Sequence, residues 1–166
     1  MPEAIERTAT AQRDHPTFTF GDLLFRTLVP KAFSGAVSVF EVDLAAGCLS
    51  GPLHVHDKED GIAYVLEGRL TFQVGDTISA ASAGDVVQLP RGVRHTFWNA
   101  GSVPARALDI VTPGGLENYY EALARIADAP DVMAQLASME ADFGIHMDWD
   151  SIAVLSARFG MRFAEV

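Results

Sequence analysis

The sequence predicts a mainly β domain, a sandwich or barrel of short strands, followed by C-terminal α-helices. In residues 17–113, short runs rich in β-branched and aromatic residues are separated by Gly and Pro turns at regular spacing. Beyond Pro113 the apolar residues recur at helical spacing instead. A chain of 166 residues with 49% hydrophobic residues can build one domain with a proper core.

Residues 1–16 have no clear periodicity and are predicted to form an N-terminal arm, either paired with a partner subunit or disordered. Residues 18–29 predict one or two strands, and residues 37–44 predict another. On one face of the latter strand, Glu41 points either into the barrel, toward a substrate, or to a sheet surface, which we favour. Residues 45–52 are predicted to be a loop because they contain two glycines and a proline.

A further strand is predicted around His54 and His56, and six more follow it. Their predicted bounds are 62–66, 69–74, 77–79, 86–89, 95–98 and 105–111. In 69–74, apolar residues alternate with polar ones, which is the pattern of a strand with one buried face.

Residues 114–166 are predicted to form a helical extension that packs on the barrel or on a dimer partner. Helices are expected at 116–127, 131–143 and 149–159, with Gly144 and Gly160 as C-caps of the second and third. A lid over the barrel mouth is the functional alternative for these helices. The lone His146 in this region is interpreted as structural.

Three histidines are the candidate functional residues. His54 and His56 are two residues apart, so both imidazoles lie on one face of a strand. His95 begins another strand, just after the turn Pro90-Arg-Gly92. Histidine is the commonest metal ligand, although a single His-x-His pair is more often a polar pair on the wet face of a strand. The third histidine makes a metal site the better interpretation.

These two stretches resemble the paired motifs of the cupin family. The second motif, G-x5-P-x-G-x2-H-x3-N, is matched at every fixed position, by Gly84, Pro90, Gly92, His95 and Asn99. The first motif, G-x5-H-x-H-x3–4-E-x6-G, is matched by His54, His56 and Gly68. The resemblance covers roughly residues 33–113. It implies a jelly-roll β-barrel in which the three histidines converge on one divalent metal ion, with Fe, Ni, Mn, Cu and Zn as candidates.

The glutamate of the first motif is missing, because Gly61 stands at its position. Asp60 satisfies the shorter family spacing, but strand parity points it away; Glu59 has the right parity but lies one pleat early, about 6–7 Å along the strand. Three alternatives follow: one of these carboxylates is an extra ligand, three histidines hold the metal alone, or the metal is weakly bound or absent. We favour three histidines with a metal, because burying three imidazoles without a cation gains little.

The resemblance also indicates where a substrate would lie. Ala63 and Val65 share the parity of position 61, and Phe97 shares that of His95, so these three side chains are predicted to line the pocket. Neutral histidine ligands leave the charge of the cation uncompensated, which favours an anionic chelate such as an enolate, a catecholate or a carboxylate.

The motif spacing and the C-terminal extension resemble quercetinase-like cupin dioxygenases, which implies a metal-dependent enzyme acting on an enolisable or phenolic small molecule. One alternative is a redox-neutral cupin cyclase or isomerase of the polyketide type, with the metal as a Lewis acid. Another is a non-catalytic cupin that binds a small molecule. The resemblance also suggests a homodimer.

Composition narrows the range of partners. The formal net charge is −10, so neither nucleic acid nor an anionic membrane is an expected partner. No apolar run reaches the ~20 residues that span a bilayer, and no signal peptide is visible. The single cysteine, Cys48, excludes an intrachain disulfide and is expected in the core. We therefore predict a cytoplasmic protein.

Overall fold

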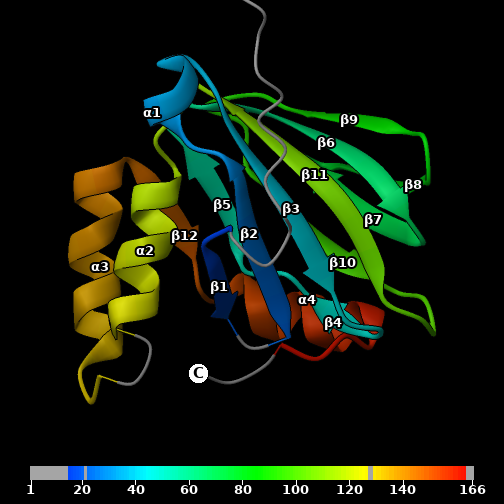
Figure 1. Cartoon of the computed structure of the whole chain (residues 1–166). Helices are drawn as coiled ribbons and strands as arrows, with labels where there is room; N and C mark the ends of the chain where they lie inside the picture. Colours follow the sequence, from blue (N-terminus) through cyan, green and yellow to red (C-terminus); the bar gives the residue numbers. More distant parts are fainter. Residues whose placement is uncertain (1–14, 21, 127–128, 164–166) are drawn as a thin grey trace, which may run out of the picture.

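The computed structural model describes residues 15–20, 22–126 and 129–163, and its strands form two antiparallel sheets that face each other (Figure 1). The first sheet runs in the order β1 (Thr17–Phe20), β2 (Leu23–Val29), β3 (Ser38–Leu44), β11 (Ala105–Thr112), β6 (Asp60–Glu67) and β9 (Val86–Leu89). The second runs in the order β12 (Ile145–Asp148), β5 (Leu53–His56), β10 (His95–Asn99), β7 (Arg69–Val74) and β8 (Thr77–Ser82), and β4 (Cys48–Leu49) also pairs with β10.

From β5 to β11 the chain passes repeatedly between the two sheets, with only the hairpin β7–β8 staying in one. This is the predicted β-barrel architecture, and the strand bounds match the predictions to within a few residues. The core lies between the sheets, because the strands alternate apolar inward and polar outward. In β3, for example, Phe40, Val42 and Leu44 are buried. Cys48 is also fully buried there.

Glu41 lies on the opposite face of β3 from this core. Its carboxylate forms an ion pair with Arg26 of β2 and lies 3.9 Å from Arg106 of β11. Glu41 is therefore a sheet-surface residue, which was the favoured alternative.

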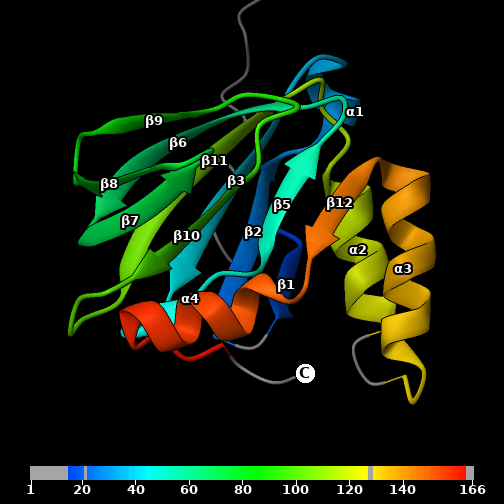
Figure 2. The ribbon, with the colours of Figure 1, turned by 180° about the vertical axis from the view of Figure 1, so that it is seen from behind.

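The helices are α1 (Lys31–Ser34), α2 (Glu117–Ile126), α3 (Val132–Phe143) and α4 (Ser151–Phe159). Figure 2 shows α2 and α3 side by side at the end of the barrel formed by β1, β2 and β12, with α4 below β10. Gly144 and Gly160 adopt left-handed conformations and donate to Glu140 O and Ser156 O, so both predicted C-caps are confirmed. No helix in the described ranges is long and apolar enough to cross a membrane.

The sequence patterns missed three short elements. The strand β12 lies between the cap Gly144 and α4, and it pairs with β5, so the C-terminal extension also contributes to the second sheet. The strand β4 lies inside the segment 45–52 that was predicted to be a loop, and α1 follows Pro30. Each is four residues or shorter, too short for a periodicity to show. The predicted arm, apart from His15 and Pro16, lies outside the described residues.

Candidate metal centre

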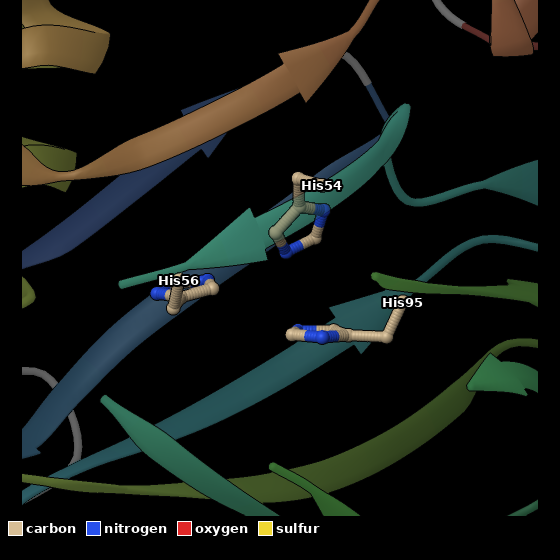
Figure 3. A group of neighbouring side chains, drawn as sticks. All are labelled: His54, His56 and His95. Atoms are coloured by element: carbon tan, nitrogen blue, oxygen red, sulfur yellow. The ribbon is translucent and has the colours of Figure 1, made fainter. Parts of the chain in front are cut away.

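His54, His56 and His95 come together inside the barrel, beside the junction of β5 and β10 (Figure 3). His54 and His56 share one face of β5, and His95 is the direct cross-strand partner of His54. The ring centroids are 4.5 Å apart for His54 and His95, 5.2 Å for His54 and His56, and 5.4 Å for His56 and His95. One ring nitrogen from each histidine lies within 4.8 Å of the others, so the three can ligate one ion.

The Pro-x-Gly turn fixes how His95 approaches the other two. Gly92 has φ of +72°, a conformation that residues with a Cβ rarely adopt, and its N–H donates to the carbonyl of His56 at 2.8 Å. Val93 N–H closes the turn by donating to Pro90 O at 3.2 Å. The turn therefore ties the start of β10 to the end of β5 at the level of the histidines.

Backbone carbonyls select the tautomers of two histidines. Nδ1 of His54 lies 2.9 Å from Pro52 O, and Nδ1 of His95 lies 2.9 Å from Val93 O. A carbonyl can only accept, so Nδ1 carries the proton in both rings and Nε2 keeps its lone pair. This arrangement is the usual way in which a metal-binding imidazole is oriented.

The surroundings also keep these imidazoles uncharged. Burial, and the neighbouring imidazoles, lower the pKa of His54 well below its usual range. Burial likewise lowers the pKa of His95 to about 4. Neutral imidazoles are the form that binds metal, and the buried Nδ1 of His56 has no hydrogen-bond partner among the described residues. The donor set therefore fits a divalent cation.

The two carboxylates proposed as extra ligands have different surroundings. Asp60 turns away from the cavity: it accepts hydrogen bonds from the backbone N–H and guanidinium of Arg91, which hold its pKa down to about 2. Glu59 lines the cavity, and its Oε2 lies 3.4 Å from His56 Nδ1. Among the described residues, however, the group that can hold an ion consists of the three histidines without a carboxylate. Glu59 therefore lies next to His56 but is not part of the group of candidate ligands.

A cavity of about 120 Å³ opens in front of the histidines, with mostly apolar walls. Ala63 and Phe97 line it, as the strand parity predicted. Val65 does not: its side chain is fully buried in the core, beyond the cavity wall. Alternation along a strand predicts which face a side chain lies on, but it does not predict how far along that face the cavity extends.

One wall of the cavity comes from α2, which the sequence analysis treated only as packing or a lid. The Tyr120 ring stacks on Phe25 of β2 at 4.1 Å and meets the edge of Phe40 at 5.1 Å. Glu117 anchors α2, because its carboxylate accepts hydrogen bonds from Ser38 Oγ at 2.6 Å and from Lys31 N–H at 2.8 Å. This helix is thus fastened to the barrel at its first turn.

Asp109 of β11 is a further residue of the site that was not predicted from the sequence. It lines the cavity, and its Oδ1 is buried with no hydrogen-bond partner in the described structure. Burial raises its pKa to about 6, against a smaller opposing effect of His56. The available signal was an acidic residue between Leu108 and Ile110, in a strand that is otherwise mostly apolar.

Comparison with known proteins agrees with this geometry. Residues 40–111 match the model of the Cupin_2 family, described as a cupin domain. The tetracenomycin polyketide synthase protein TcmJ of Streptomyces glaucescens is 32% identical over 90 residues, which is 53% of this chain and 60% of that protein. Germin-like protein 5-1 of Oryza sativa subsp. japonica is 37% identical over 79 residues, 43% of this chain and 34% of that one. The chain thus spans between a third and three fifths of the length of these curated relatives.

Solved structures share the fold. A sugar phosphate isomerase from a cupin superfamily, from Silicibacter pomeroyi, superposes with a TM-score of 0.55 at 22% identity over 63% of this chain and 75% of that one. A predicted oxalate decarboxylase from Thermotoga maritima gives 0.59 at 21% identity, over 64% of this chain and 99% of that one. With the paired histidine motifs and the antiparallel barrel, the match over residues 40–111 supports a small cupin domain in this chain.

Proposed function

We propose that this protein is a metal-dependent enzyme in which His54, His56 and His95 hold one divalent cation, and that it acts on an enolisable or phenolic small molecule as a quercetinase-like dioxygenase. The observation that supports this most is the cluster itself: three imidazoles, with ligand atoms within 4.8 Å of one another, at the wall of an apolar cavity.

The charge of the ligand set favours one class of substrate. Three neutral ligands leave both positive charges of the cation uncompensated, and the low polarity of the cavity strengthens its attraction for an anion. An enolate or phenolate supplies that negative charge on an oxygen atom, and its carbon skeleton suits the apolar walls. When bound, a metal with open coordination positions supplies either the activation of O₂ or the polarisation of a substrate oxygen.

The chain's own residues prepare the site for this chemistry. Carbonyls of Pro52 and Val93 hold two of the imidazoles in the ligating tautomer. Phe97 and Tyr120 are aromatic residues of the lining, against which an aromatic or enolic ring can pack. The helix α2, fastened to the barrel by Glu117, forms one wall of the cavity, and the mostly apolar lining limits contact of the substrate with water.

A redox-neutral cyclase or isomerase is the second candidate, favoured by the similarity to TcmJ, whose name places it with a polyketide synthase. The same cation would then act only as a Lewis acid. A third, weaker candidate is a cupin that binds a small molecule without catalysis.

Metal analysis and oxygen uptake together test these candidates. Protein purified without added metal is analysed for bound metal, and O₂ consumption is followed with quercetin and with acetylacetone. The proposal expects one metal per chain and O₂ uptake with at least one substrate class. Zinc with oxygen-independent turnover of a polyketide-type substrate would favour the cyclase, and a metal-free protein would contradict both enzymes.

The homodimer and the cytoplasmic location stay predictions from the resemblance and the composition. Light scattering of the purified chain tests the first, and fractionation of the host cell tests the second.

A further inference from the structure

Gly61 has no side chain, and side chains of the neighbouring strands take up the room in front of its Cα. A Cβ added to Gly61 would lie 3.2 Å from Leu89 Cβ, tighter than most real contacts, and 3.7 Å from Asp109 Oδ1. The neighbouring strands β9 and β11 therefore already occupy the space in front of Gly61. One of the atoms occupying it is a carboxylate oxygen.

Asp109 reaches this space from the neighbouring strand. In the β6–β11 pairing Val111 lies opposite Gly61 and Asp109 lies opposite Ala63, one pleat further along the same face. Its side chain lines the cavity together with the three histidines. The strand register thus brings a carboxylate to the part of the cavity where the first cupin motif would have had one.

This carboxylate is available to a ligand. Its buried Oδ1 has no hydrogen-bond partner among the described residues, and buried polar atoms in native proteins are nearly always bonded. Tyr120 of α2 lines the same cavity, and burial, together with the charge of Asp109, raises the pKa of its phenol well above the usual range. Asp109 is not a member of the histidine group that can hold an ion.

We propose that Asp109 is a substrate-binding residue, whose carboxylate accepts a hydrogen bond from a hydroxyl group of the molecule bound in the cavity that Asp109 and Gly61 both line. The inference rests on the proposed function in placing the substrate in this cavity, and it narrows the substrate class to small apolar molecules that carry a hydroxyl donor. A neutral ether or a hydrocarbon of the same shape would leave Asp109 buried and unpartnered, which is costly.

The test compares 2-naphthol with 2-methoxynaphthalene, in which a methyl group replaces the hydroxyl hydrogen. Dissociation constants are measured by titration calorimetry with the full chain as purified. A hydrogen bond to a charged group predicts that the wild type binds 2-naphthol about tenfold or more tightly than its ether. In Asp109→Ala this ratio falls about tenfold, because any preference that a bound cation adds is common to both proteins, and Asp109→Asn, which keeps one acceptor oxygen, retains part of the wild-type ratio.

Metal content, measured on the same samples, separates this inference from the proposed function. Asp109→Ala and Asp109→Asn are expected to hold as much metal as the wild type, because Asp109 is not a ligand. The exposed Asp76→Ala variant is the matched control and leaves both metal and ratio unchanged. A wild type that does not prefer 2-naphthol, a ratio that survives in Asp109→Ala, or metal loss in both Asp109 variants would overturn the inference. Absence of metal from every sample would refute only the proposed function, since the fall in the ratio on removing Asp109 is compared between proteins of equal metal content.

Discussion

Buried polar groups are hydrogen-bonded at one end of β10 and lack hydrogen-bond partners in the cavity at its other end. At its C-terminal end, Asn99 is almost fully buried and uses both ends of its amide: Nδ2 donates to Leu44 O at 3.1 Å and Val103 O at 2.8 Å, and Oδ1 accepts from Gly101 N–H at 2.9 Å. At its N-terminal end, His95 faces a cavity where His56 Nδ1, Glu59 Oε2 and Asp109 Oδ1 are buried without hydrogen-bond partners.

This difference separates what folds the domain from what binds. A satisfied buried amide stabilises one conformation, whereas an unsatisfied buried group is costly unless something else completes it. In the described part of the chain, five buried side-chain atoms have no partner, and three of them line this one cavity. The remaining two, Thr27 Oγ1 and Arg106 Nε, lie outside it. The ends can be told apart by asking which substitutions change binding and which change stability.

Removal of a histidine should have the largest effect on binding. His95→Ala deletes one of three ligands, and we expect purified protein to contain essentially no metal while its circular dichroism stays native. The matched control is His146→Ala, since His146 is an exposed residue that pairs only with Asp57, at 2.9 Å. Elemental analysis of both variants checks this prediction. Equal metal content in the two would contradict a site at the histidine cluster.

Asn99→Ala should have the largest effect on stability. It removes the hydrogen bonds to Leu44 O of β3 and to Val103 O and Gly101 N–H of the loop after β10, so we expect a loss of roughly 3–5 kcal/mol in the free energy of unfolding. Metal bound per folded chain should not change. Urea unfolding measures the loss, with the exposed Asn118→Ala as the control, expected to be within about 0.5 kcal/mol of the wild type. A metal deficit in Asn99→Ala would mean that the two ends are coupled.

Asp109 should make the stability of metal-free protein depend on pH. Its folded-state pKa, about 6, lies above its ordinary value of 3.8, so folding favours the protonated form. Its contribution is therefore present below pH 4 and is lost as the pH rises through 6, by at most about 3 kcal/mol. The side chain of Asp109→Asn stays neutral throughout, so the stability of this variant relative to the wild type should increase between pH 4 and pH 8. Urea unfolding of chelator-treated protein measures the free energy of unfolding of both proteins as a function of pH. If the two pH profiles run parallel, ionisation of Asp109 does not destabilise the fold and the prediction is wrong.

Glu59 should have a smaller effect, confined to metal affinity. Its carboxylate lies 3.4 Å from His56 Nδ1, where it can orient and polarise a ligating ring. Such partners typically contribute about 10–100-fold to affinity, so Glu59→Gln should weaken metal binding toward the lower end of that range. Competition with a chromogenic chelator measures the change. Asp60→Asn is the matched control, because Asp60 is engaged with Arg91 and should leave the affinity unaltered.

Local patterns predicted most of this molecule. Alternation in β3, β6 and β7 follows from residues that must face either core or water. Strand parity places His54 and His56 on one face, and the resemblance to the paired cupin motifs adds His95 to them. Asp109 could not be found in this way, because its place beside Gly61 depends on the register between β11 and β6. The same holds for Tyr120, which reaches the cavity only because α2 docks on β2 and β3. Parity reveals a face, and only tertiary structure reveals what meets on it.

The packing of α2 against the barrel has a consequence for how such a domain can diversify. The histidines lie within residues 40–111, the segment that matches the cupin family, whereas Phe25, Leu116, Tyr120 and Leu123, which close the chamber, lie outside it. Substitutions in the flanking segments can therefore change the shape of the cavity without changing the three histidines. Exchanging residues 116–123 between related chains is accordingly a direct route to altered ligand preference at constant metal affinity.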